Sequence, residues 1–399
     1  MSAPLLLDLS HTSHTSARTG IQRVARSLWR ELGDAARPIT YDPHQQTWRA
    51  LDAWERDQLT ADSCSPKRGV TWPLAARLRG YSRRLFASAP SVVHPSTLAP
   101  HFGLLVPELF TPTVAATWPA LFAATQGPRV AVFHDAIALK FPELTPTKTV
   151  ARFPGYLREL LAFDGIAANS EDSRATLMAY WDWLEVPAAA RPVVVTIPLG
   201  IDPPSTVAEP HSSAATALPV VLSVGSLEGR KNHSALLDAC EALWSAGARF
   251  ELHLVGLAHP QTGRTALARV QSLQAAGRPL RYSGPVNDAA LATAYAACAF
   301  TVYPSLIEGF GLPVLESLAR GKPCICSAHG ALGEAARDGG CLALDHVDAS
   351  ALAAAISRLL TTPHELAALA DAAQARTFRT WRDYAHDVAA WLPTLSRRA

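Results

Sequence analysis

The sequence predicts an α/β protein made of two doubly wound domains. Short, continuous apolar runs bounded by turn residues alternate with longer helical patterns along almost the whole chain, which indicates parallel strands joined by helices. Twelve such runs are too many for one open sheet. The 399 residues also exceed one ordinary core of about 100–200 residues. Two separate sheets follow from these observations.

The expected strands divide evenly between the two halves of the chain. In the first half they are 4–10, 38–43, 103–109, 129–135, 165–170 and 192–198. In the second half they are 219–226, 249–256, 280–286, 300–305, 323–328 and 339–345. Between the halves lies LGIDPPSTVAEPHSSAATA, at 199–217, which is rich in Pro, Ser and Ala and has no periodicity. We therefore expect the domain boundary there.

Composition favours a globular protein in a reducing compartment. Hydrophobic residues make up 49% and charged residues 18% of the chain, and a net charge of +2 does not suggest a nucleic-acid binder. The six cysteines show no disulfide framework and no CxxC pair, so buried thiols are favoured over a metal or redox role. Residues 1–14 do not have the pattern of a signal peptide, and no window approaches the roughly 18 apolar residues of a spanning helix. We expect a cytoplasmic protein.

The segment EGFGLPVLE, at 308–316, follows an expected strand. In a doubly wound sheet ligands bind at the carboxyl ends of the strands, so this position is a candidate site. A glycine-broken loop leads into a helix that we expect to begin near Leu312, with Pro313 in its first turn. The amides of Phe310, Gly311 and Leu312 would form an anion site, because glycines let the backbone approach a ligand closely.

Two glutamates bracket this anion site. Glu308 lies in the loop just ahead of it, and Glu316 lies one turn into the helix. A carboxylate beside a bound phosphate is repulsive unless it binds another part of the same ligand. A nucleoside diphosphate sugar would meet this condition, with its ribose at Glu316 and its sugar at Glu308. The alternative is an acidic helix start that merely complements the helix dipole.

A second charged segment, SVGSLEGRKN at 223–232, also follows an expected strand. Arg230 and Lys231 stand where a helix opens, and cations in that position oppose the helix dipole. They suit a diphosphate, because a pair of unit charges about 4 Å apart is worth about 4 kcal/mol at an effective dielectric constant of about 20. A solvated basic turn is the alternative.

Three features of the first half are candidates for a site. Thr19 and Gly20 open a helix, as a second anion site or as a surface turn. His134 ends an expected strand, where it faces a ligand or serves as a capping or core residue. His11 and His14 have no third ligand near them, so a metal site is disfavoured.

Residues 67–86, KRGVTWPLAARLRGYSRRLF, contain six basic residues and no acid. Leu74, Leu78, Tyr81 and Leu85 share one face of the expected helix. Such a basic amphipathic segment is typical of a helix at a membrane surface. A solvated helix that packs one face on its own domain is the alternative.

Five motifs in order, VVVTIPLGID, SVGSLEGRKN, LHLVG, YSGPV and YPSLIEGFGLPVLESLARGKP, resemble the retaining glycosyltransferases of family 4, above all their second domain. Those enzymes have the GT-B fold, two facing Rossmann-like domains with the active site in the cleft between them. The resemblance covers essentially the whole chain and is strongest over 193–330. It implies an acceptor-side domain at 1–198, joined by the C-terminal helix at about 380–399, and a nucleotide-sugar-binding domain at 199–379.

The resemblance also implies roles for single residues. Lys231 and Arg230 would bind the donor diphosphate, Glu316 the ribose, and Glu308 the donor sugar. The family's histidine near the donor sugar corresponds to His134, which we take as the second catalytic residue. The remaining donor contacts implied are Phe310, Gly311, Leu312, Gly20, Ser226, Leu257 and Val286. Many members carry an arginine at the position of Ser226, so neutralisation of the phosphates would rest more on the Arg230–Lys231 pair.

The chemistry implied is transfer of a hexose, with retention, to a glycan or polyprenyl-linked glycan of surface polysaccharide or lipopolysaccharide synthesis. HDAIALKFPE, at 134–143, is similar to stretches in bacterial mannosyl- and rhamnosyltransferases, so GDP-mannose is the first choice over UDP-glucose. The chain has no DxD motif, and we expect no metal and no cofactor. Residues 67–86 would contact the cytoplasmic face of the inner membrane. A sugar-nucleotide epimerase or phosphorylase of the same fold, and a non-catalytic nucleotide-sugar-binding protein, stay open.

Overall fold

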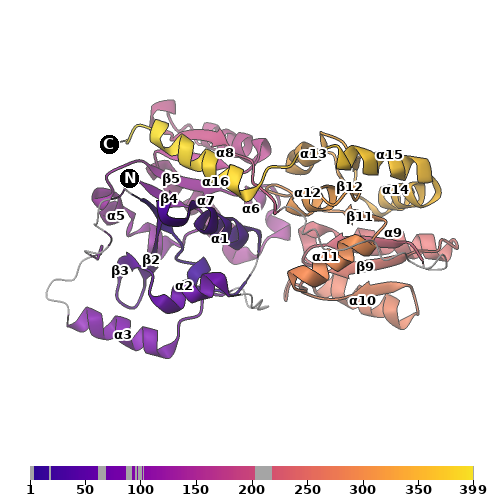
Figure 1. Cartoon of the computed structure of the whole chain (residues 1–399), viewed down its shortest axis with the longest axis horizontal. Coiled ribbons are helices and arrows are strands. Elements are labelled where there is room, and N and C mark those ends of the chain that lie inside the picture. The colour runs from indigo at the N-terminus through magenta and orange to yellow at the C-terminus, as the bar shows by residue number, and fades with distance from the viewer. Residues whose placement is uncertain are drawn as a thin grey trace. The chain divides into compact units, whose positions relative to one another are not determined.

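The computed structural model describes residues 4–17, 19–61, 69–86, 92–94, 97, 101, 103–202 and 218–398. The chain forms two compact units. The first contains Met1–His134, Ala151–Gly200 and Trp381–Ala399, and the second contains Asp135–Val150 and Ile201–Thr380. The C-terminal helix therefore belongs to the unit that holds the N-terminus, and it packs against the first long helix of that unit (Figure 1).

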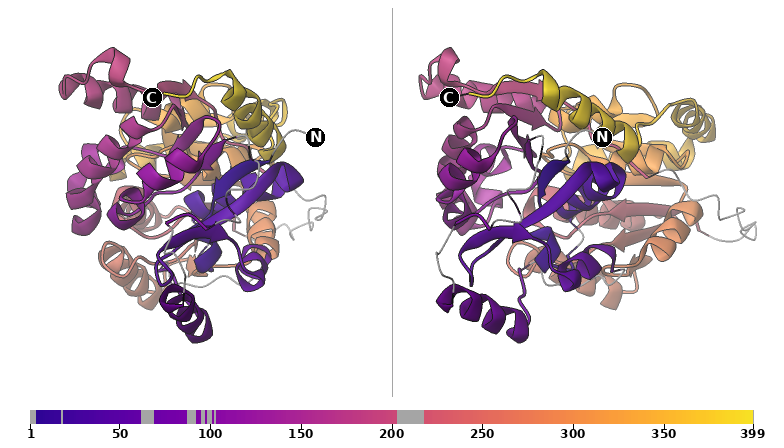
Figure 2. Two further views of the ribbon diagram at one scale, coloured as in Figure 1. Left: turned by 90° about the vertical axis from the view of Figure 1, so that its left-hand side faces the viewer. Right: turned by 60° about the vertical axis from the view of Figure 1, so that its left-hand side comes forward.

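The first unit is a parallel sheet with helices on its faces. Its strands are β1 (Leu5–Asp8), β2 (Ala36–Asp42), β3 (Thr47–Ala50), β4 (Leu104–Val106), β5 (Arg129–Phe133), β6 (Gly165–Ala168) and β7 (Val193–Thr196). Its helices are α1 (Gly20–Leu32), α2 (Ala53–Thr60), α3 (Leu74–Leu85), α4 (Pro112–Ala115), α5 (Trp118–Ala124), α8 (Glu171–Trp183), α16 (Trp381–Trp391) and most of α7 (Thr147–Glu159). Figure 2 shows the same elements from two further sides.

The seven strands have the order β3-β2-β1-β4-β5-β6-β7. All neighbours are parallel except β2 and β3, which form an antiparallel hairpin with Ile39 opposite Ala50. The order reverses between β1 and β4, so the ligand-binding edge of this sheet lies at the carboxyl ends of these two strands. The aromatic core on this sheet includes the stacked rings of Trp48 and Trp118 and the edge-on ring of Phe163.

The second unit repeats this plan with six strands. They are β8 (Val220–Val224), β9 (Glu251–Val255), β10 (Leu280–Tyr282), β11 (Phe300–Tyr303), β12 (Cys324–Ser327) and β13 (Cys341–Leu344). Its helices are α6 (Ile137–Lys140), α9 (His233–Ser245), α10 (Arg264–Ala275), α11 (Asp288–Ala297), α12 (Leu312–Leu318), α13 (Gly330–Ala336), α14 (Ala349–Thr361) and α15 (Pro363–Gln374).

The sheet of the second unit is entirely parallel, in the order β10-β9-β8-β11-β12-β13. Its reversal point lies between β8 and β11, where Phe300 is opposite Val221. The largest core cluster includes Phe250, Leu252 and Val302 and is covered by side chains of α9, α10 and α14. Continuous apolar strands such as VVLSV are thus covered on both faces, as their sequence predicts.

All twelve predicted strands are present, and the α/β fold class is confirmed. One strand was not predicted. β3 is the short segment TWRA, which contains an arginine and has no apolar run of its own. It is a strand because it pairs with β2 across a tight turn at Gln46, where φ is 58°. Tertiary pairing therefore overrides a weak local signal.

Among the described residues, the structure has no helix with both the length and the apolar character that crossing a bilayer requires.

Gly256 shows how tightly the carboxyl ends of β8 and β9 approach each other. Its φ is 149°, and a Cβ atom built on it would lie only 2.0 Å from the carbonyl oxygen of Gly225. The backbones of the two loops would therefore have to move apart to admit any side chain. These two loops follow β8 and β9 at the carboxyl ends of the strands, where ligands bind in doubly wound sheets. The close approach therefore shapes the region in which a ligand would bind.

We predict that Gly256→Ala destabilises the second unit by about 3 kcal/mol, because backbone strain and a backbone clash add. Gly277→Ala is the matched control. Gly277 also has a positive φ, 71°, but a Cβ atom on it would have no neighbour within 4 Å, so its substitution should cost about 1 kcal/mol. Urea unfolding of both variants measures the difference. Equal effects would contradict the close approach at Gly256.

Candidate functional site

The loops that follow β8 and β11 are hydrogen-bonded to each other at the carboxyl ends of the strands of the second sheet. After β8 the chain forms a short 3-10 helix, Gly229–Lys231, and α9 begins one residue later, at His233. The carbonyl of Arg230 accepts hydrogen bonds from the amide of Leu306 (2.9 Å) and the hydroxyl of Ser305 (3.2 Å). These bonds hold the basic turn beside the loop that follows β11.

Glu308 forms ion pairs with both cations of that turn. Its Oε2 lies 2.8 Å from Nη1 of Arg230, and its Oε1 lies 2.5 Å from Nζ of Lys231. The hydroxyl of Ser305 donates to the Glu308 carboxylate, and Nζ of Lys231 donates to the hydroxyl of Tyr303. The side chains of Arg230, Lys231 and Glu308 are 23%, 9% and 10% exposed. The cluster is therefore mostly removed from water.

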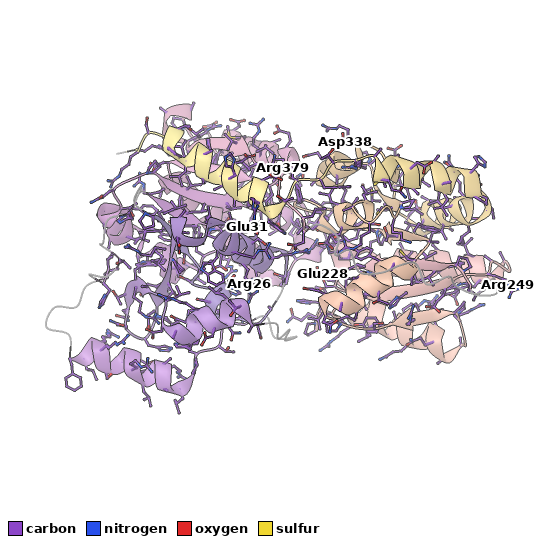
Figure 3. The ribbon with its side chains drawn as sticks, viewed as in Figure 1. Arg26, Glu31, Glu228, Arg249, Asp338 and Arg379 are labelled. Carbon is purple, nitrogen blue, oxygen red and sulfur yellow. The ribbon has the colours of Figure 1, made fainter. Side chains whose placement is uncertain are left out.

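A second carboxylate completes the charge balance. Glu228, labelled in Figure 3, accepts a hydrogen bond of 3.0 Å from Nη2 of Arg230 and one of 2.8 Å from the hydroxyl of Ser226. Arg230 and Lys231 thus face the carboxylates of Glu228 and Glu308. In this structure Ser226, one of the predicted donor contacts, orients Glu228.

Burial and charge act in opposite directions on these groups. Burial raises the pKa of Glu308, but Arg230 and Lys231 outweigh it and hold this pKa at about 2. Burial lowers the pKa of Lys231, and the charge of Arg230 lowers it further, while Glu308 opposes both. Glu308 is therefore ionised at ordinary pH, and its negative charge is what favours the protonated form of the buried Lys231.

The loop before α12 takes the predicted course. The helix begins at Leu312, and Gly311 precedes it with a φ of 102°, which favours glycine. Glu316 is buried on this helix. Because α12 has only seven residues, few peptide dipoles are aligned in it. The positive charge available to an anion here comes mainly from the side chains of Arg230 and Lys231.

The other predicted donor contacts of the second unit lie on neighbouring loops. The carbonyl of Leu257 accepts a 2.9 Å hydrogen bond from the amide of Leu227, so the loop after β9 runs beside the one that carries Glu228. Val286 packs on the small hydrophobic cluster at the ends of β8 and β9. Phe310 is half-buried in the loop before α12. Their contacts with a donor stay predictions.

His134 and Gly20 belong to the first unit. Nε2 of His134 donates to the carbonyl of Pro107 (2.7 Å), and Nδ1 accepts from the side chain of Asn169 (3.0 Å). The imidazole is thus held as the neutral tautomer with its proton on Nε2. Gly20 is the exposed first residue of α1, and a Cβ atom on it would have no neighbour within 4 Å. That His134 or Gly20 takes part in the reaction remains a prediction.

His14 is held in a buried ion-pair network. Its Nε2 lies 2.7 Å from Oε1 of Glu55, which also accepts two hydrogen bonds from Arg49. Burial raises the pKa of Glu55, but His14 and Arg49 together lower it to about 2. The imidazole also stacks on Trp72, with 3.9 Å between the ring centres. Among the described residues, no group of three or more His, Cys, Asp or Glu side chains could hold a metal ion.

Two buried carboxyl groups at the edge of the first sheet were not singled out from the sequence. Glu108 follows β4 and accepts hydrogen bonds from the amides of His11 (2.9 Å) and Thr12 (2.8 Å). Burial, and then the nearby Asp8, raise the pKa of Glu108 to about 8, while burial raises that of Asp8 to about 6. These carboxyl groups fix the loop that follows β1.

Three members of the charged cluster were also missed. Tyr303 and Ser305 stand two positions apart at the end of β11, so strand alternation places them on one face. Glu228 stands two residues before Arg230. The spacing of Tyr303 and Ser305 was a usable signal, but nothing local in the sequence shows that their hydroxyls point at Lys231 and Glu308.

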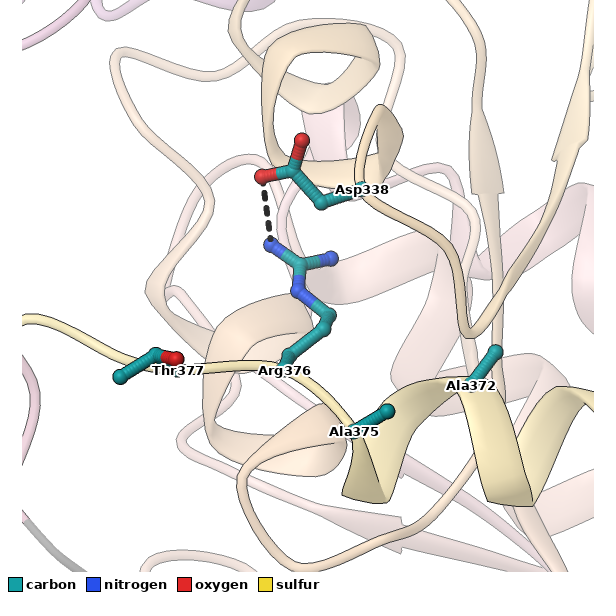
Figure 4. A pocket seen from close by; sticks show the side chains of 5 residues that line it. All are labelled: Asp338, Ala372, Ala375, Arg376 and Thr377. Carbon is teal, nitrogen blue, oxygen red and sulfur yellow. Dashed lines mark ion pairs between the residues drawn. The ribbon is translucent and has the colours of Figure 1, made fainter.

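A separate hollow on the second unit is lined by Asp338, Ala372, Ala375, Arg376 and Thr377 (Figure 4). Its arginine lies 3.6 Å from the carboxylate of Asp338 and donates to the carbonyls of Ala335 and Gly339. Arg376 therefore ties α15 to the end of α13. The hollow shares no lining residue with the charged cluster.

Comparison of the sequence with those of known proteins shows the family to which the chain belongs. Residues 209–376 match the model of the family described as glycosyl transferases group 1. The O-antigen chain mannosyltransferase B of Escherichia coli is 31% identical over 271 residues, which are 64% of this chain and 67% of that protein. The chain belongs to the group 1 glycosyltransferases.

A second relative is longer than this chain. The serotype-specific mannosyltransferase WbdA of Escherichia coli is 27% identical over 343 residues, which are 80% of this chain. The chain spans only 38% of the length of WbdA.

Solved structures of other proteins have the same fold as this chain. Sucrose-phosphate synthase from Thermosynechococcus elongatus superposes with a TM-score of 0.69 at 20% identity and covers 98% of both chains. Anabaena HepE, in complex with UDP and glucose, has a TM-score of 0.69 at 16% identity and covers 98% of this chain and 100% of its own. The chain therefore has the GT-B fold, with its two Rossmann-like units.

The pKa of Glu308 leads to a prediction for acid stability. Its ordinary value is 4.5 and its folded value about 2, so the ionised carboxylate stabilises the fold above pH 4.5, and this contribution is lost as the pH falls toward 2. Between pH 5 and pH 3.5, the wild type should lose about 1 kcal/mol more unfolding free energy than Glu308→Gln. Urea unfolding at the two pH values measures this. Equal losses in the two proteins would mean that Glu308 is not held by the cations.

Proposed function

We propose that this group 1 glycosyltransferase is a retaining enzyme of family 4 that uses a nucleoside diphosphate sugar. The observation that carries the proposal is the pair formed by the buried Lys231 and the half-buried Arg230 at the carboxyl ends of β8 and β11, held by the carboxylate of Glu308. Two adjacent, mostly buried cations suit the diphosphate of a donor. The relatives named as mannosyltransferases support mannose as the sugar. GDP is the nucleotide that we propose with it.

Donor binding requires an exchange of anions in the cluster. The Glu308 carboxylate is paired with the N–H groups of Arg230 and Lys231 that a bound diphosphate would need. The diphosphate therefore replaces the Glu308 carboxylate, which is then free to accept hydrogen bonds from the hydroxyls of the sugar. Glu316, on α12, would accept hydrogen bonds from the ribose.

The reaction breaks the bond between the anomeric carbon and the phosphate oxygen. The bonding electrons leave with the diphosphate, where Arg230 and Lys231 stabilise the developing negative charge. A hydroxyl of the acceptor forms the new bond on the same face of the sugar, and its proton passes to the leaving phosphate oxygen. Fixed cations of the chain supply the positive charge, so we propose that no metal ion is needed. A glycan or polyprenyl-linked glycan is the proposed acceptor.

A panel of nucleoside diphosphates tests the donor site. GDP, UDP, dTDP and ADP are added to the full chain, with and without EDTA, and thermal unfolding is followed. A ligand at about 100 times its Kd adds about 2.7 kcal/mol of stability. We expect GDP to give the largest shift, unchanged by EDTA.

The matched charge-loss variants are Lys231→Met and Arg249→Met. Arg249 is exposed and precedes β9, so it lies at the other edge of the sheet from the cluster (Figure 3). Lys231→Met should lose the GDP shift, and Arg249→Met should keep it. If no nucleoside diphosphate shifts the unfolding of the wild type, the donor site is refuted.

Glu308→Gln tests the exchange of anions. Removing the competing charge should tighten the binding of GDP by about tenfold, which corresponds to about 1.4 kcal/mol, while sugar transfer is lost. Isothermal titration measures the affinity. Glu365→Gln removes a carboxylate of the same unit that pairs with Arg358 at the surface, and it should change neither property. Weaker or unchanged GDP binding by Glu308→Gln would contradict the exchange.

A further inference from the structure

Three cysteines lie together on one face of the second sheet. Cys324 and Cys326 alternate along β12, and Cys341 begins β13 directly opposite Cys324. Residues two apart in a strand point to the same face of the sheet. The packing agrees, because all three cysteines belong to one hydrophobic cluster, whereas Ile325 belongs to another. The alternation in the sequence reveals the first two of these thiols, and the strand pairing adds the third.

The three thiols differ in their access to solvent. Cys324 and Cys326 are fully buried beneath side chains of α12, α13 and α15. Cys341 is partly exposed, and its strand is the last in the order of the sheet. A reagent in solution therefore reaches Cys341 before it reaches the other two.

The surroundings of Cys341 favour its thiolate. Hydrogen bonds from the thiols of Cys324 and Cys326 lower the pKa of Cys341, burial opposes them, and the charge of Arg376 lowers this pKa further. Arg376, drawn in Figure 4, donates to the carbonyl of Gly339, two residues before Cys341. The Nε atom of this arginine is buried and has no hydrogen-bond partner among the described residues. A thiolate beside a buried cation is a reactive nucleophile.

The strand pairing also selects a partner for a disulfide bond. Neighbouring strands lie about 4.8 Å apart, and disulfides join Cα atoms that are about 4.4–6.8 Å apart. Cys324 is paired with Cys341 and meets this condition. Cys326 is paired with Ala343 instead, so its Cα lies one diagonal, about 8 Å, from that of Cys341. That separation is too long for a bridge unless the backbone moves.

We propose that Cys341 is an oxidation site and that Cys324 is its resolving thiol. The thiolate of Cys341 attacks hydrogen peroxide. An S–O bond forms as the O–O bond breaks, and hydroxide leaves behind a sulfenic acid. The sulfur of Cys324 then attacks the sulfenic sulfur, so that an S–S bond forms and the S–O bond breaks. The oxygen leaves as water with the proton of Cys324.

The two electrons lost by the thiols reduce the peroxide to water and hydroxide. In a reducing compartment such a bond would be transient, because cellular thiols reverse it. The oxidation site uses none of the residues assigned to the donor, so it does not depend on the proposed function.

Peptide mapping of the full chain tests the proposal. The folded, reduced protein is treated with hydrogen peroxide, alkylated with iodoacetamide and digested with trypsin without reduction. Cleavage after Arg337 separates the peptide 321–337, which holds Cys324 and Cys326, from 338–358, which holds Cys341. Peroxide should link the two peptides, fragmentation should assign the bond to Cys324 and Cys341, and dithiothreitol should release it.

Alkylation of the untreated, folded protein measures the reactivity of the thiolate. Cys298 is the control, because it lies in the same unit, is 2% exposed, and has a pKa that burial raises to about 11. Cys341 should react at least about tenfold faster than Cys298. Equal rates would contradict an activated thiolate at Cys341.

Two matched variants on β12 separate the resolving thiol from its neighbour. Cys324→Ala should form no link and should leave Cys341 as a sulfenic acid that dimedone traps. Cys326→Ala removes the other fully buried thiol of the strand and should still form the link, although more slowly, because one hydrogen bond to Cys341 is lost. Circular dichroism checks that both variants are folded.

The results that overturn the proposal come from the wild type as well as from the variants. The proposal fails if Cys341 stays reduced at a peroxide concentration that oxidises free glutathione. It fails equally if Cys341 is linked to any other cysteine of the chain or to a second copy. A link that persists in Cys324→Ala is the third contradicting result. Because the wild type alone decides the first two, the test stands even if a variant does not fold.

Discussion

Two neighbouring cations, Arg230 and Lys231, are held in a mostly buried position, and their charge must be compensated. Burial alone disfavours the charged form of Lys231 and repulsion from Arg230 adds to this. Glu308 offsets both effects through ion pairs of 2.5 and 2.8 Å. Neither cation is therefore left unpaired, because the chain supplies its own anion. In the function we propose, the diphosphate of the donor takes the place of that anion.

The fold brings this cluster together by simple means. β8 and β11 are neighbours at the point where the strand order reverses, so the loops after them leave the sheet side by side. The carbonyl of Arg230 then binds the amide of Leu306, which fixes one loop against the other. Gly311 lets the second loop turn sharply into α12. The positions of the charged groups are thus set by backbone hydrogen bonds, and the side chains need only short reaches to meet.

Much of this arrangement could be predicted from sequence, and the reason is physical. Buried parallel strands are continuous apolar runs, so all twelve expected strands are present, and strand ends mark where site residues gather. β3 was not predicted, because it is a strand only through its pairing with β2 and no local pattern in the sequence marks it. The ion pairs of Glu308 were not predicted for a related reason. They join residues 77 and 78 positions apart, and the sequence shows the charges but not that one carboxylate holds both cations.

A crystal structure with GDP bound tests the central claim most directly. The account predicts that phosphate oxygens lie within hydrogen-bond distance, about 3 Å, of the Arg230 guanidinium and the Lys231 ammonium, and that the Glu308 carboxylate has moved away from both. A structure in which GDP lies elsewhere while Glu308 still bridges Arg230 and Lys231 would contradict it.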